Sequence, residues 1–189
     1  NEHIAELYPP VSMRPLRRRV SKSLETLRRA ARRRKSGDVG YREWLDDNYH
    51  LLMREGAALL TALKYADRQP GTDKMPATCS LLYQLVHKRG VPDAQGFETL
   101  VESLQRVRPL TVFELEQLPL CLRAALILTA AQSCTAAGGE AERLLSLAVT
   151  GLRQTVGLDF EGLTERHSIV ERILDEDPAC VYSRMDQLS

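Results

Sequence analysis

Long hydrophobic runs are missing from this sequence of 189 residues. The longest apolar run, from Leu118 to Leu128, is broken by Pro119, Cys121 and Arg123. A membrane-spanning helix needs about 18 consecutive apolar residues, so we expect no transmembrane segment within these residues. Apolar residues still make up 43% of the chain and charged residues 27%, a balance that excludes a wholly disordered or collagen-like protein.

The sequence also lacks the alternation of β-branched and aromatic residues that is typical of β-strands. Apolar residues recur at helical spacing instead, and glycines and prolines separate the segments. These patterns predict an all-α fold of seven or eight helices in an antiparallel bundle or orthogonal array. The expected helices cover about residues 12–36, 39–67, 77–89, 93–109, 111–137, 140–156 and 159–176, and Pro119 either kinks the fifth or starts a new one. Residues 1–11 are expected to be a lead-in, and residues 12–189 a single helical domain.

Local signals mark where the helices begin and which residues are buried. Ser12, Asp93 and Asp159 are expected to cap helices, and Thr111 with Glu114 has the form of a capping box. Trp44, the only tryptophan, opens an apolar stripe that Leu45, Tyr49 and Leu52 continue, so we expect it in the core.

Motifs for catalysis are missing as well. There is no glycine-rich phosphate loop, no Gly-x-Ser-x-Gly turn and no Cys–His pair at a recognisable spacing. The four cysteines, at positions 79, 121, 134 and 180, show no Cys-x-x-Cys spacing. Cys121 and Cys134 stand in apolar helical sequence, where a free cysteine behaves as a small hydrophobe. The sequence therefore predicts a reducing compartment, no enzyme active site, and no cofactor or small-molecule ligand.

Three sets of acidic and histidine residues have spacings that occur in metal sites. Asp47 and His50 share one face of a helix, within the cluster Asp46, Asp47, Asn48, His50 and Glu55. His167 and Glu171 are four residues apart, and Asp175, Glu176 and Asp177 adjoin Pro178. Because no matching group stands on a second helix, we expect hydrogen bonding and ion pairing on helix surfaces, and no metal site.

Charged residues are distributed unevenly along the chain, although its net charge is only +1. Between Arg14 and Lys35 there are 11 Lys and Arg residues and one acid, whereas the remaining chain is acidic overall. Leu16, Val20, Leu24 and Leu27 form an apolar stripe in the same segment, which predicts a basic amphipathic helix over residues 12–36. This helix can be a solvated face paired with the acidic body, can lie on an anionic membrane, or can neutralise nucleic-acid phosphates. The candidate contacts are Arg17, Arg18, Arg28, Arg29, Arg32 and Arg33.

Three longer stretches resemble a known family when they are taken together and in this order. They are residues 44–52 (WLDDNYHLL), residues 108–127 (RPLTVFELEQLP leading into LRAALI) and residues 167–186 (HSIVERILDEDP running on to VYSRMD). The chain from about residue 10 to residue 189 resembles the N-terminal region of cyclic β-1,2-glucan synthase-like proteins. These are large bacterial membrane proteins that couple a UDP-glucose-dependent glucosyltransferase to a glycoside phosphorylase-like domain.

The resemblance implies a non-catalytic helical accessory domain on the cytoplasmic side of the bacterial inner membrane. None of the family's catalytic motifs falls within these residues, so no catalytic residue is carried over. The expected partners are the downstream domains of the same polypeptide and an anionic membrane surface. Residues 177–189 would connect to the next domain, and the candidate docking segment contains Asp177, Pro178, Tyr182, Met185 and Asp186. The alternative is a free-standing regulatory module whose basic helix binds nucleic acid, although that helix lacks aromatic residues for base stacking.

Overall fold

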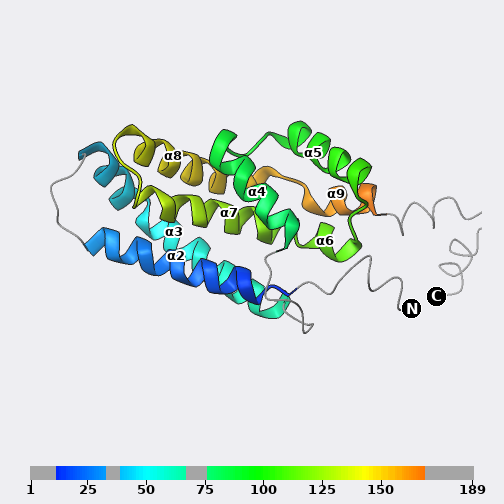
Figure 1. The fold of residues 1–189 in the computed structure, drawn as a ribbon, viewed down its shortest axis with the longest axis horizontal. Coiled ribbons are helices and arrows are strands. Elements are labelled where there is room, and N and C mark those ends of the chain that lie inside the picture. Colours follow the sequence, from blue (N-terminus) through cyan, green and yellow to red (C-terminus); the bar gives the residue numbers. More distant parts are fainter. Residues whose placement is uncertain (1–11, 33–38, 67–75, 169–189) are drawn as a thin grey trace, which may run out of the picture. The chain divides into compact units, whose positions relative to one another are not determined.

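The computed structural model describes residues 12–32, 39–66 and 76–168. These residues form eight α-helices and one 3₁₀ turn, with no strand among them, which confirms the all-α prediction (Figure 1). The elements are α2 (Arg14–Arg32), α3 (Val39–Ala66), α4 (Ala77–Arg89), α5 (Ala94–Val107), α6 (Val112–Glu116), α7 (Leu118–Ser133), α8 (Gly139–Gln154), η1 (Thr155–Gly157) and α9 (Phe160–His167). No helix in the described part of the chain is both long enough and apolar enough to span a bilayer.

The helices divide between two compact units. Of the described residues, unit 1 contains 12–32, 39–66, 76–91 and 119–157, and unit 2 contains 92–118 and 158–168. The single domain expected over residues 12–189 stays a prediction, and the expected lead-in and the docking segment at 177–186 lie outside the described residues.

The expected helix caps are present. The side-chain oxygens accept backbone N–H bonds as follows: Ser12 from Arg14 at 3.2 Å, Asp93 from Gly96 at 2.8 Å, Asp159 from Gly162 at 2.9 Å, and Thr111 from Glu114 at 3.2 Å. Each bond satisfies an N–H group that the first turn of a helix leaves without a partner.

Two helix ends differ from the prediction. A new helix, α7, begins at Leu118 with Pro119 in its first turn, and it ends at Ser133 rather than near residue 137. The last described helix, α9, ends at His167 instead of continuing to about residue 176. Ser168 has φ −69° and ψ 124°, so the backbone there is extended and leaves the helical path.

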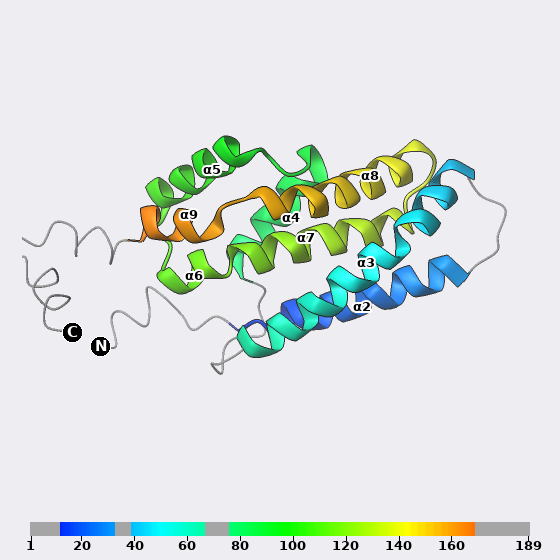
Figure 2. The same cartoon turned by 180° about the vertical axis from the view of Figure 1, so that it is seen from behind.

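In unit 1, helix α7 lies among α3, α4 and α8 (Figures 1 and 2). Its sequence is apolar around most of its circumference, as is typical of a buried helix. The buried residues of α7 within unit 1 are Cys121, Leu122, Ala124, Ala125, Leu126, Ile127, Thr129, Ala130, Ala131 and Ser133. The Thr129 hydroxyl donates to the Ala125 carbonyl at 2.9 Å, so the helix itself satisfies this buried polar group.

Trp44 is half-buried, so the prediction that it belongs to the core is wrong. The buried stripe of α3 consists of Leu45, Leu52, Leu59 and Leu63, which are 0–3% exposed. Trp44 precedes Leu45 by one residue and is therefore about 100° away around the helix. The tryptophan consequently borders the core instead of filling it.

An aromatic pair and a bridging glutamine are among the contacts that connect the helices of unit 2. Phe97 of α5 and Phe160 of α9 meet edge to face, with ring centroids 5.6 Å apart. The Gln105 side chain donates to the His167 carbonyl at 2.8 Å and accepts from the Leu110 N–H at 2.6 Å. One side chain thus ties α9 and the α5–α6 loop to α5.

The carboxylate of Glu114 closes the capping box of α6 and pairs with Arg108. It accepts from the Thr111 N–H at 3.0 Å and from Arg108 Nη1 at 3.2 Å, and the residue is only 9% exposed. Burial raises the pKa of Glu114, but these hydrogen bonds and the Arg108 charge outweigh it and leave the pKa below its ordinary value of 4.5.

Glu114 is therefore expected to stabilise the fold at neutral pH. Because its folded pKa is lowered, this stabilisation is fully present above the unfolded pKa near 4.5 and is lost as the pH falls through the folded pKa. We expect Glu114→Gln to lower the free energy of unfolding by about 1–3 kcal/mol at neutral pH and by less in acid. Urea denaturation at both pH values measures this, with the exposed Glu116→Gln as the matched control. Equal losses of stability at both pH values would contradict the assignment of this stabilisation to the ionised carboxylate of Glu114.

Candidate anion-binding surface

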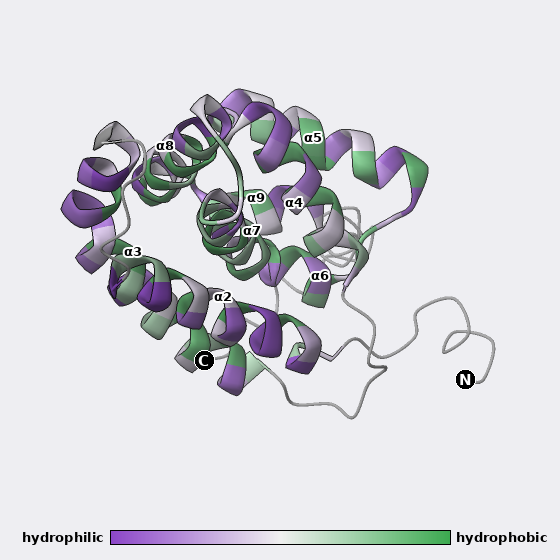
Figure 3. Cartoon of the chain, turned by 60° about the vertical axis from the view of Figure 1, so that its left-hand side comes forward, coloured by the Kyte–Doolittle hydropathy of each residue, from purple (hydrophilic) through white to green (hydrophobic). Residues whose placement is uncertain are grey.

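The basic helix α2 is amphipathic in the structure. Leu16, Val20, Leu24 and Leu27 are 0–3% exposed, and they anchor the helix to unit 1. The remaining faces carry the arginines, and α2 accordingly shows purple and green patches along its length in Figure 3. Burial of the apolar stripe fixes which arginines face outward.

Helix α3 packs antiparallel to α2 (Figures 1 and 2). Gly56 allows the approach, because a β-carbon at this position would lie 2.3 Å from Leu24 Cδ2. A groove runs along α2 and is bordered by α3. Its lining residues are Arg17, Arg18, Ser21, Lys22, Glu25, Thr26, Arg28, Arg29, Leu60 and Lys64, and this set is called the basic groove below.

Cations dominate the basic groove. Six of its ten residues are Lys or Arg and one is acidic, which leaves a local formal charge of +5. The single acid, Glu25, accepts from Arg29 Nε at 2.9 Å within α2. The Thr26 hydroxyl donates to the Lys22 carbonyl and so is satisfied by its own helix. The formal charge of the groove residues is therefore strongly positive, which suits an anion.

The structure brings most of the predicted arginines to this surface. Arg17 is half-buried, whereas Arg18, Arg28, Arg29 and Arg32 are exposed. Four of these five line the groove, Arg32 stands at the end of α2, and Arg33 lies outside the described residues. Two further lysines line the groove and were not among the predicted contacts. Lys22 belongs to the basic tract and could have been included, whereas no local pattern connects Lys64 with α2.

Arg19 belongs to another side of the helix. Its charge acts on Tyr83 of α4, although burial dominates there and raises the pKa of Tyr83. The tract of arginines is thus divided between different neighbours, because 100° separates successive residues of a helix.

Two members of the polar cluster on α3 connect this helix to its neighbours. Asn48 is buried, donates to the Trp44 carbonyl at 2.9 Å and accepts from Arg153 at 3.0 Å. Glu55 accepts from Arg123 of α7 at 2.6 Å. Among residues 12–32, 39–66 and 76–168, no three His, Cys, Asp or Glu side chains gather as metal ligands.

His167 does not meet its predicted partner within the described residues, because Glu171 lies outside them. Its buried Nε2 has no hydrogen-bond partner in the described part of the chain and is 3.8 Å from a carboxylate oxygen of Glu98. Arg166 donates to the same Glu98 oxygen at 2.8 Å. The arrangement is an ion pair at the α5–α9 contact, with a histidine beside it.

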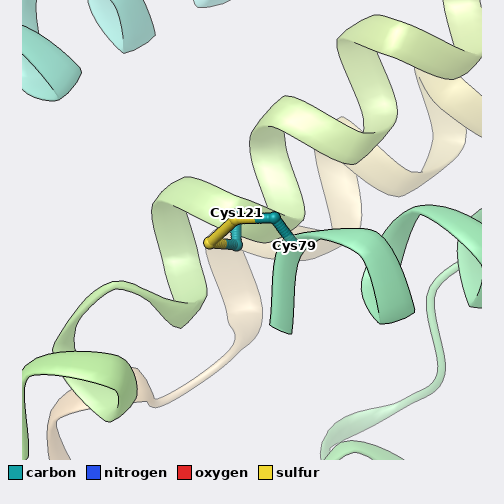
Figure 4. Close-up of a disulfide and its surroundings, with 2 residues drawn as sticks. All are labelled: Cys79 and Cys121. Carbon is teal, nitrogen blue, oxygen red and sulfur yellow. A yellow bond between two sulfur atoms is a disulfide. The ribbon is translucent and has the colours of Figure 1, made fainter. Parts of the chain in front are cut away.

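Two cysteines are paired, contrary to the expectation of unpaired thiols. Cys79 of α4 and Cys121 of α7 form a disulfide with their Cα atoms 4.7 Å apart (Figure 4). Both are buried, and packing of α4 on α7 brings them together although 42 residues separate them in the sequence. Disulfides persist in oxidising surroundings, which speaks against the predicted reducing compartment.

Cys134 is a free thiol at the end of α7. The Tyr41 hydroxyl lies 3.1 Å from Ser133 Oγ and donates to Cys134 Sγ at 3.4 Å. Burial raises the pKa of both Tyr41 and Cys134. The thiol therefore stays protonated at neutral pH, and this cluster is unsuited to nucleophilic chemistry.

The basic groove is thus the described feature with the clearest capacity to bind a partner. Comparison of the chain with models of protein families, with curated proteins and with solved structures found no match.

Proposed function

We propose that this chain is a non-catalytic helical docking domain, and that the basic face of α2 holds it against an anionic membrane surface. The observation that carries the proposal is the division of α2 into a buried leucine and valine stripe and an exposed cationic face. An amphipathic helix already anchored to a folded domain presents its charges without having to fold on the membrane. Each basic residue near an anionic surface contributes about 1 kcal/mol.

The family resemblance supports a more specific form of the proposal. In that form, the domain is an accessory part of a cyclic β-1,2-glucan synthase-like glucosyltransferase. The full-length protein would transfer glucose from UDP-glucose to a β-glucan, and this domain would pack on the transferase at the cytoplasmic side of the membrane. The support is the order of the three stretches that resemble the family, whereas the Cys79–Cys121 disulfide is unusual for that compartment.

Vesicle co-sedimentation tests the membrane proposal. We expect Arg28→Gln, Arg29→Gln and Arg32→Gln together to weaken binding to anionic vesicles roughly a hundredfold, because three residues contribute about 3 kcal/mol. Glutamine keeps the helix propensity and removes only the charge. Added salt should weaken wild-type binding as well.

The matched control removes three exposed arginines elsewhere, Arg54, Arg89 and Arg106, in the same way. We expect this variant to bind like the wild type. Equal losses in both variants would assign binding to net charge instead of α2, and absent wild-type binding would refute the proposal. Tighter binding to single-stranded DNA than to vesicles would favour the nucleic-acid alternative, for which the groove offers no aromatic side chain among its lining residues.

A further inference from the structure

We propose that the basic groove binds a phosphate monoester, with Arg17 of α2 and Lys64 of α3 on opposite sides of it. This inference rests on the proposed function in assigning the same surface, and it adds the chemical class of the ligand. A diffuse basic face attracts any anionic surface, whereas two converging cations select a compact group with two negative charges.

The helix geometry places these two residues opposite each other. Leu24 of α2 lies against Gly56 of α3, which fixes the register of the pair. Arg17 is seven residues before Leu24, or about 10 Å along α2, and Lys64 is eight residues after Gly56, or about 12 Å along α3. Because the helices are antiparallel (Figures 1 and 2), both displacements run in the same direction and end at the same part of the groove.

Ser21 completes this part of the site. Arg17, Ser21, Leu24 and Arg28 follow one another at spacings of four, three and four residues, so they form one strip along α2. Since Leu24 contacts α3, this strip borders α3 and its polar members face the groove. Leu60 of α3 lies one turn before Lys64 and supplies an apolar wall.

Four cations of the basic groove are available to a ligand. Within the described part of the chain, Arg17, Arg28 and Lys64 form no ion pair, and Glu25 is already engaged by Arg29. Lys22 has no acidic partner in the same residues. An incoming anion would therefore not have to displace an existing carboxylate from these side chains.

The side chains present match a phosphate monoester. A guanidinium donates two parallel N–H bonds to neighbouring phosphate oxygens, and an ammonium adds a mobile point charge. A serine hydroxyl donates a further hydrogen bond. A monoester carries about −1.5 to −2 charges at neutral pH, compared with about −1 for a diester, so it gains more from converging cations.

Vesicles of equal surface charge containing either phosphatidic acid, a monoester, or phosphatidylglycerol, a diester, test the proposal. We expect the wild-type chain to bind phosphatidic acid vesicles about tenfold more tightly, which corresponds to about 1.4 kcal/mol. The double variant Arg17→Gln and Lys64→Gln should lose this preference. The control, Lys88→Gln and Arg89→Gln, removes the same charge outside the groove and should keep it.

Glycerol phosphate, a soluble phosphate monoester, distinguishes a lipid headgroup from a free phosphate as the ligand. Its binding to the chain is measured by titration calorimetry. If the wild type and the control variant bind glycerol phosphate and the groove variant does not, the monoester site is supported. If in addition no vesicle binds, only the membrane proposal is refuted. Vesicle binding with equal affinity for both lipids would overturn the monoester site and leave the membrane proposal standing. An equal loss of preference in the control variant would also overturn the site.

Discussion

Reduction of the Cys79–Cys121 disulfide is expected to lower the free energy of unfolding by about 4 kcal/mol. The bond joins residues separated by 42 positions, and for a loop of this length the chain-entropy relation gives roughly 4 kcal/mol. Both cysteines are at most 2% exposed, so their thiols would remain buried after reduction of the folded chain. Urea denaturation with and without dithiothreitol measures the difference.

The double variant Cys79→Ala and Cys121→Ala is the control, and reductant should leave its stability unchanged. Cys134→Ala should keep the full effect of reductant, because Cys134 is not in the bond. A wild-type midpoint that does not respond to reductant would show that the pair is reduced in the purified protein. That result would support the prediction, made from the sequence, that the protein belongs to a reducing compartment.

The contact between α7 and α8 carries the second large expected effect. Leu126 is fully buried, and a β-carbon on Gly151 would lie 2.4 Å from its Cδ2 atom and 2.8 Å from Val91 Cγ2. We expect Leu126→Ala to destabilise the fold by about 2–5 kcal/mol through the cavity it leaves. Gly151→Ala should cost about 1–3 kcal/mol, because a methyl group has no room there.

The two changes should compensate in part when combined. The new methyl group at position 151 enters space that the Leu126 side chain has vacated, so the double variant should lose less stability than the sum of the single variants. Gly139→Ala is the control in the same helix, because a β-carbon added there would have no atom within 4 Å. This change should be neutral or stabilising by up to about 1 kcal/mol. Strict additivity in chemical denaturation would show that Leu126 and Gly151 are not in contact.

Local sequence patterns predicted much of the secondary structure. The bounds of α3 and α4 lie within one residue of expectation, and the capping side chains make the expected bonds. A cap, a turn glycine such as Gly90 with φ 80°, and the apolar stripe of α2 all act over a few residues. Their effect can therefore be read without knowing which helix is the neighbour.

Local patterns indicate only one side of the candidate site. The arginines of α2 stand together in the sequence, so their tract by itself predicts a cationic helix. Lys64 joins them only because Gly56 lets α3 approach Leu24 closely. A charge from a distant segment has no local signature, since its position depends on the register between two helices.

The sequence by itself determined the helical class, the starts of the helices and the amphipathic character of α2. The tertiary structure alone decided that Cys79 meets Cys121, that Lys64 joins the arginines of α2 in the basic groove, and that Trp44 borders the core. The physical reason is the distance along the chain over which the interactions act. Backbone hydrogen bonds and side-chain caps are settled within about one helical turn, whereas pairing and burial depend on how each helix is rotated against a neighbour many residues away.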